Sequence, residues 1–170
     1  MSDAMLLTEG TRPAVRIERR LPDPPELVWA ALTEREQLRA WFPCDVIVEQ
    51  WDPGAEISFV FPADVIDLTL SGHVLEVDEP RLLVFTWGEE TLRFELSPEA
   101  GGTLLALINE LPATAAARNA AGWEDCLDRL AGIEPAADAW RLRFSAYTES
   151  FEPLIGHQDG PPAGYKGKLD

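Results

Sequence analysis

Residues 24–42 read PPELVWAALTEREQLRAWF and carry two tryptophans on a helical period that breaks near the middle. The first half places one apolar stripe on a helix: Leu27, Val28, Ala31 and Leu32. We predict that Asp23 caps this helix, and that Thr33 caps a second one whose buried side is Leu38, Trp41 and Phe42. Two short helices in succession either cap a small core or close one end of a ligand cavity.

The sequence on both sides of this stretch has the period of two that is typical of β-strands. Upstream, residues 14–21 alternate and predict a strand, whereas residues 1–13 have no period and predict a loose arm. Downstream, residues 44–109 contain six strands joined by short turns, and Gly72 indicates a bulge or bend in one of them. The pattern predicts an α+β protein with a curved antiparallel sheet of about seven strands.

Helical periodicity returns after the last strand. A long helix from about residue 113 has one continuous face, Ala116, Ala120, Trp123, Leu127 and Leu130, and Gly132 is expected to end it. A further helix over residues 136–152 has an aromatic face, Trp140, Phe144, Tyr147 and Phe151, and we expect Pro153 to end it. Residues 157–170 are predicted to be an irregular tail.

Charge and composition exclude several classes of partner. Thirty acidic and fourteen basic residues give a formal net charge of −16, which repels phosphate backbones and anionic lipids. We therefore expect neither nucleic acid nor a membrane as partner. No apolar run approaches the ~20 residues that span a bilayer, and no signal peptide is evident, so we expect a cytoplasmic protein. Cys44 and Cys126 are expected to be buried thiols.

The long helix is uneven along its inner face. Its first half shows only Ala116 and Ala120 to the core, so space remains there that either opposing aromatic residues fill or a ligand occupies. Asn109 points inward on the last strand and needs backbone, water or a ligand as its partner. The predicted cavity wall is Trp41, Phe59, Phe61, Trp87, Asn109, Ala116, Ala120 and Trp123.

The order of elements resembles the helix-grip fold. The segments PPELVWAALTEREQLRAWFP, DPG, GHVLEVDEPRLLVFTW, GGTLLALIN and GWEDCLDRL follow each other as in the SRPBCC (START-like) superfamily, in the branch named for the activator of the heat-shock-protein-90 ATPase. The resemblance implies a helix-grip domain over residues 14–132, with two short helices and a long C-terminal helix over the concave face. It also implies a cavity between sheet and long helix for a small hydrophobic or aromatic molecule. Residues 133–156 lie beyond it, and we expect them to form an additional helix that packs on the domain or on a partner.

The sequence contains no recognisable group of catalytic residues. No histidine or cysteine has neighbours at metal-ligand spacing, and no nucleotide-binding or nucleophile motif is present, so we expect no metal and no cofactor. In this branch the strand that ends at Asn109 commonly ends in histidine. Binding of a small hydrophobic molecule is the leading hypothesis. The alternatives are a co-chaperone-like or self-associating module, as a homodimer through Trp140, Phe144, Tyr147 and Phe151, and a cyclase or hydrolase that uses Asn109 and a bound water.

Overall fold

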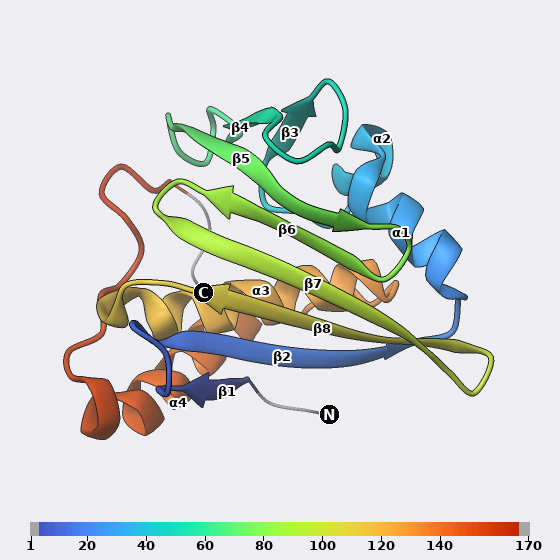
Figure 1. Ribbon diagram of the computed structural model, residues 1–170. Coiled ribbons are helices and arrows are strands. Elements are labelled where there is room, and N and C mark those ends of the chain that lie inside the picture. Colours follow the sequence, from blue (N-terminus) through green and yellow to red (C-terminus); the bar gives the residue numbers. More distant parts are fainter. Residues whose placement is uncertain (1–3, 167–170) are drawn as a thin grey trace.

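The computed structural model describes residues 4–166, in which one large sheet carries its helices on one side (Figure 1). The elements in chain order are β1 Met5–Leu7, β2 Ala14–Leu21, α1 Pro25–Thr33, α2 Arg35–Leu38, β3 Asp45–Val48, β4 Glu56–Val60, β5 Thr69–Asp78, β6 Leu82–Trp87, β7 Glu90–Glu99, β8 Gly102–Glu110, η1 Ala113–Ala115, α3 Ala116–Leu130 and α4 Ala139–Ile155. No helix in this described part is long and apolar enough to cross a membrane.

The sheet has eight strands in the order β1-β2-β8-β7-β6-β5-β4-β3, all paired antiparallel. The meander from β3 to β8 returns to the N-terminal strand β2, where Ile17 lies opposite Leu107. Alternation in β8 buries Leu105, Leu107 and Asn109 completely on the inner side. The predicted α+β helix-grip architecture is confirmed, with one strand more than expected.

The additional strand is β1. Met5–Leu7 pairs with the first residues of β2, so the prediction of a loose arm over residues 1–13 is wrong for this segment. The pairing depends on a partner strand and not on local sequence, because three residues are too few to show a period.

The two short helices lie together beside one end of the sheet (Figure 1). Their caps differ from the prediction: the first residue before α1 is Pro24, with ψ 161°, and the one before α2 is Glu34, and neither gives a side-chain cap. Thr33 instead donates its hydroxyl to the Trp29 carbonyl at 2.8 Å, the back-bonding typical of threonine inside a helix. The prediction of Asp23 and Thr33 as caps is therefore wrong.

Gly72 of β5 lies tightly against the backbone of Thr86 in β6. A Cβ at this position would meet the Thr86 carbonyl oxygen at 2.0 Å, so no other residue fits without movement of the backbone. The register irregularity of β5 falls slightly later, between Val74 and Glu76. The predicted bulge is thus present in this strand, while the glycine itself serves close packing.

α3 crosses the concave side of the sheet, packs most closely on β2 and carries α4 on its other side. Buried polar contacts join the two helices: the Tyr147 hydroxyl donates to Glu124 Oε2 at 2.7 Å, and Arg143 contacts Asp125 and, at 2.8 Å, Asp128. The backbone N–H of Ala4 donates to the Tyr147 oxygen at 2.8 Å, which ties the start of the chain to α4.

α4 continues past the residue that was expected to end it. Pro153 lies inside the helix, which runs to Ile155 and ends at Gly156 with a φ of 89°. The proline lies in the last turn, so its missing N–H removes a single bond and the helix completes that turn. The glycine supplies an extended conformation with positive φ, which stops the helix.

Candidate functional site

Aromatic rings occupy the space between the sheet and α3. Trp87 of β6 contacts Trp123 of α3 with ring centroids 5.3 Å apart. Phe42 lies at the centre of this cluster and has five ring neighbours, Trp41, Phe59, Phe85, Trp87 and Trp123. Ala116 and Ala120 are fully buried above the sheet. The small side chains of α3 are thus matched by large ones from the sheet and from the end of the α2 segment.

Asn109 is the centre of a polar cluster at the N-terminal end of α3. Its Oδ1 accepts from Asn119 Nδ2 at 2.9 Å and from Trp123 Nε1 at 3.0 Å. Its Nδ2 donates to Glu90 Oε1 at 3.0 Å and to the carbonyls of Thr91 and Glu110. The inward-pointing amide therefore has protein partners on both its atoms, as a buried amide requires.

Glu90 is the ionisable member of this cluster. Burial raises the pKa of its carboxyl group above the usual range, and the bonds from Asn109 and Asn119 and the charges of Arg118 and Arg12 oppose that shift. Asn119 Nδ2 donates to Glu90 Oε1 at 2.7 Å. Two amide donors on one carboxylate oxygen hold the side chain in place.

Trp87 carries a buried polar atom without a strong hydrogen-bond acceptor. Its indole N–H is buried without a hydrogen-bond acceptor among the described residues, and its polar neighbour is the thiol of Cys44, a weak acceptor. Burial raises the pKa of Cys44 to about 12, against the opposing effect of that N–H. The thiol is therefore neutral and inert, and the same holds for Cys126, whose pKa burial also raises to about 12.

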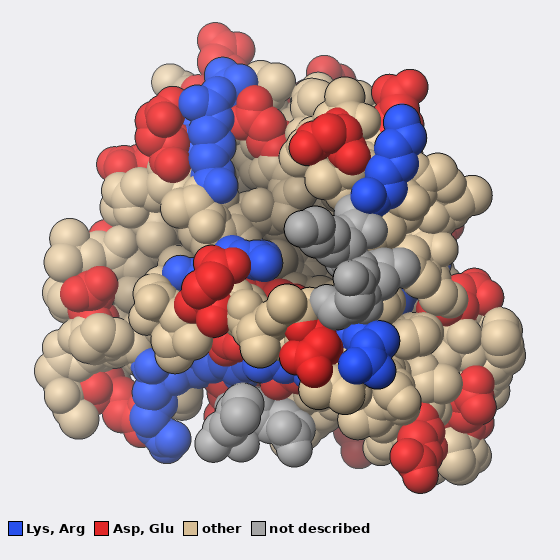
Figure 2. All heavy atoms as spheres, turned by 180° about the vertical axis from the view of Figure 1, so that it is seen from behind, with Lys and Arg blue, Asp and Glu red and all other residues tan. Residues whose placement is uncertain are grey.

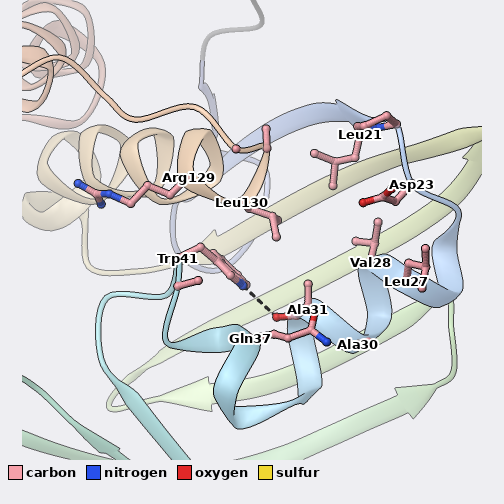
Figure 3. A pocket seen from close by; sticks show the side chains of 14 residues that line it. Leu21, Asp23, Leu27, Val28, Ala30, Ala31, Gln37, Trp41, Arg129 and Leu130 are labelled. Carbon is pink, nitrogen blue, oxygen red and sulfur yellow. Dashed lines mark hydrogen bonds between the residues drawn. The ribbon is translucent and has the colours of Figure 1, made fainter.

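An open groove lies at the other end of α3, between that end and the two short helices (Figure 3). Its volume is about 540 Å³, within the range of small-molecule sites. Figure 3 shows Trp41, Leu130, Val28 and Ala31 converging on this space. Trp41 is 3% exposed, and its indole N–H donates to the Ala31 carbonyl at 2.9 Å, so the ring is fixed as a wall.

Few charged groups border the groove. Arg129 belongs to its lining, but its guanidinium points away from the converging side chains (Figure 3) and pairs with Glu134 at 3.7 Å. Asp23 lies at the rim, where its carbonyl accepts the Thr103 hydroxyl at 2.7 Å and holds the entry to α1. The face of the molecule shown in Figure 2 mixes acidic and basic side chains around a central hollow, without one large basic area. The groove is suited to apolar molecules and not to highly charged ones.

The predicted wall residues fall into three places. Trp41 lines the groove, and Phe61 lines a second, smaller opening of about 330 Å³ beside Phe42 and Cys44. The other predicted residues lie together in the interior and are Phe59, Trp87, Asn109, Ala116, Ala120 and Trp123. Trp41 also touches Phe42 and Phe94, with ring centroids 5.4 and 6.1 Å apart, and so connects the interior to the groove.

Sequence reasoning missed two kinds of residue. Leu21 and Leu130 line the groove, but the sequence predicts only that Leu130 lies on the inner face of the long helix and says nothing specific of Leu21. Glu90 and Asn119 complete the Asn109 cluster, and neither is among the predicted site residues. The inward position of Asn109 was the signal, because a buried amide indicates further polar groups nearby.

The aromatic face of α4 lies largely against its own domain. Tyr147 and Phe151 are buried, and Trp140 and Phe144 are half-buried and stacked on each other with ring centroids 4.9 Å apart. The four residues named for the alternative of a homodimer thus pack, fully or in part, on their own chain. Among the described residues, no group of three or more His, Cys, Asp or Glu side chains is placed to hold a metal ion.

Comparison with known proteins identifies the family. The profile of the Activator of Hsp90 ATPase homolog 1-like proteins matches residues 23–133, more than half of the chain. The chain belongs to this family. It is the AHSA1-like branch of the SRPBCC superfamily, so the resemblance in the sequence is confirmed. Comparison with curated proteins gives no match.

Solved structures of the same fold extend over most of the chain. A conserved protein of unknown function from Enterococcus faecalis, EF2215, has a TM-score of 0.74 at 24% identity, covering 89% of this chain and 91% of its own. CalU16 from Micromonospora echinospora has a TM-score of 0.67 at 24% identity, covering 90% and 94%. DynU16, from the dynemicin biosynthetic locus, has a TM-score of 0.60 at 25% identity, covering 70% of this chain and 46% of its own.

Proposed function

We propose that this AHSA1-like protein binds a small apolar molecule in the groove between α1, α2 and the C-terminal end of α3. The groove itself carries the proposal: about 540 Å³ of open space whose wall includes an immobilised tryptophan and whose lining is mainly aliphatic. Removal of an apolar surface from water at such a wall is favourable at ~25 cal/mol per Å². The interior between sheet and α3, by contrast, is already occupied by rings.

The groove has the means to select for size. Ala30 and Ala31 on α1 and Ala131 after α3 keep the space open, because larger side chains at these positions would fill it. Leu27, which is 58% exposed, stands at the rim where a bound molecule would cover it. A molecule of moderate size with no charge meets all of these conditions.

The test is titration of the full chain with the neutral fluorescent probe N-phenyl-1-naphthylamine, followed by competition with uncharged alkyl and aromatic compounds. Ala31→Leu puts three further carbon atoms at the groove and is expected to weaken probe binding at least about tenfold. Ala146→Leu is the matched control, because Ala146 is exposed on α4 and away from the groove, and it should bind as the wild type does. Absence of probe binding, or equal binding by Ala31→Leu, would contradict the proposal.

A further inference from the structure

The N-terminus of α3 lacks a cap from its own sequence. The preceding residue is Ala115, which offers no side-chain acceptor, yet the first N–H groups of a helix have no partner within it. The acceptor is Gln158, whose Oε1 accepts from the N–H of the fully buried Ala117 at 2.8 Å. Gln158 Nε2 donates to the Ala113 carbonyl at 2.9 Å, and the side chain is 4% exposed. A single side chain from the C-terminal segment thus satisfies one backbone donor and one backbone acceptor at the η1–α3 junction.

Further hydrogen bonds hold the segment that contains Gln158, which we name the C-terminal strap (residues 156–166). The N–H of Asp159 donates to the Thr114 carbonyl at 2.8 Å, and Arg118 Nη1 donates to the Gly160 carbonyl at 3.1 Å. At its far end, the N–H of Lys166 donates to the Val65 carbonyl at 2.5 Å. Val65 lies in the connection between β4 and β5, so the strap joins α3 to the opposite half of the sheet.

The strap runs from the N-terminus of α3 to the connection between β4 and β5 (Figure 1). α3 packs most closely on β2, while on its β6 side the distance to the sheet is bridged by rings, with Trp87 against Trp123 and Phe61 against Trp87 at a centroid distance of 6.1 Å. Trp87 also holds the buried indole N–H that lacks an acceptor among the described residues. The interior between α3 and β6 therefore combines large aromatic surfaces with an indole N–H whose polar neighbour is the weak acceptor Cys44.

The strap is held by polar contacts and not by burial in the core. None of residues 156–166 belongs to the buried apolar cluster, although the preceding Ile155 packs against it. Tyr165 is half-buried, and burial raises the pKa of its hydroxyl. A segment with few apolar contacts opens locally at much lower free energy than the whole domain unfolds.

We propose that the C-terminal strap is a gate: it closes the β6 side of the aromatic interior when docked, and its release gives aromatic molecules access to Trp87 and Trp123. The two fixed points of the gate are Gln158 on the N-terminus of α3 and the Lys166–Val65 backbone bond. This inference does not rest on the proposed binding in the groove, whose lining includes no residue of the strap.

The experiment uses two substitutions in the full chain, one at each fixed point. Gln158→Ala removes the cap, and Lys166→Pro removes the backbone donor to Val65. His157→Ala, at a side chain 76% exposed, and Lys166→Ala, which keeps the N–H, are the matched controls. The readouts are acrylamide quenching of tryptophan fluorescence, binding of anilinonaphthalene sulfonate, and hydrogen exchange of the Ala117 amide, with far-UV circular dichroism to monitor the fold.

We expect both gate variants to keep their circular dichroism, to be quenched more strongly and to bind the dye, whereas both controls match the wild type. In Gln158→Ala, the Ala117 amide should exchange about tenfold faster or more, because its buried N–H has lost its acceptor. Folded gate variants with unchanged quenching and no dye binding would overturn the proposal. Loss of the fold in both would also overturn it, since the segment would then be an integral part of the domain.

Discussion

The two ends of α3 border the same domain in opposite ways. At the N-terminal end every polar group of Asn109 has a partner, and a segment from 41 residues further along the chain caps the helix. At the C-terminal end the helix ends at Leu130, Gly132 turns the chain with a φ of 81°, and the neighbouring short helices leave an open groove. The comparison teaches that one helix can close the core at one end and leave a binding surface at the other. Large aromatic rings close the N-terminal end, whereas small alanine side chains keep the groove open at the C-terminal end.

The largest expected effect on stability is at the closed, N-terminal end of α3. Asn109→Leu keeps a similar volume but removes the partners of Trp123 Nε1, Asn119 and Glu90, so the free energy of unfolding should fall by about 3 kcal/mol or more. Urea unfolding at pH 7.5 measures it. Gln37→Leu at the exposed rim of the groove is the control and should change stability by no more than ~0.5 kcal/mol. Equal losses in both variants would remove the distinction between the two ends.

A smaller effect is expected where the groove meets the core. Trp41→Phe keeps an aromatic ring but removes the bond to the Ala31 carbonyl, so the free energy of unfolding should fall by about 1–2 kcal/mol. The same variant should bind N-phenyl-1-naphthylamine more weakly, because the wall of the groove recedes. An unchanged unfolding midpoint with unchanged probe affinity would show that Trp41 supports neither.

The pH dependence of the free energy of unfolding should reveal the titration of the Glu90 carboxyl group. Its folded-state pKa is raised by burial, so the contribution of this carboxyl group is greatest below its unfolded pKa and is lost as pH rises through the folded pKa. Glu90→Gln retains a carbonyl oxygen for both amide donors but does not titrate. Relative to the variant, the wild type should therefore lose stability between pH 5 and pH 7.5, measured by urea unfolding. A constant difference between the two proteins over this range would contradict the assignment.

The smallest effect on stability is expected at the rim of the groove. Leu27→Ser changes a side chain that is 58% exposed, so unfolding should shift by no more than ~0.5 kcal/mol. Binding of the naphthylamine probe should nevertheless weaken about two- to fivefold, because the leucine covers part of the bound molecule. Leu154→Ser, at a side chain 69% exposed on α4, is the matched control and should leave binding unchanged.

Local periodicity was sufficient to predict most of the fold. The buried faces of β8 and α3 follow directly from alternation in the strand and from steps of three and four in the helix. These patterns place Asn109, Ala116 and Trp123 in the interior, as expected. The contacts that join distant segments could not be predicted in this way. Gln158 caps a helix that begins 42 residues before it, and Met5–Leu7 forms a strand only because β2 is there. The groove could not be predicted from the sequence either, since it depends on where α3 ends relative to α1.

The lengths of the edge strands have a consequence for the behaviour of the protein in concentrated solution. Within the described residues the sheet is bounded by β1 with three residues and β3 with four, its two shortest strands. Short edges offer few unpaired backbone groups to another chain, so they give little template for aggregation through strand addition. Because a net charge of −16 adds mutual repulsion, we expect the protein to stay dispersed at neutral pH and to associate most readily near its isoelectric point of about 4.4.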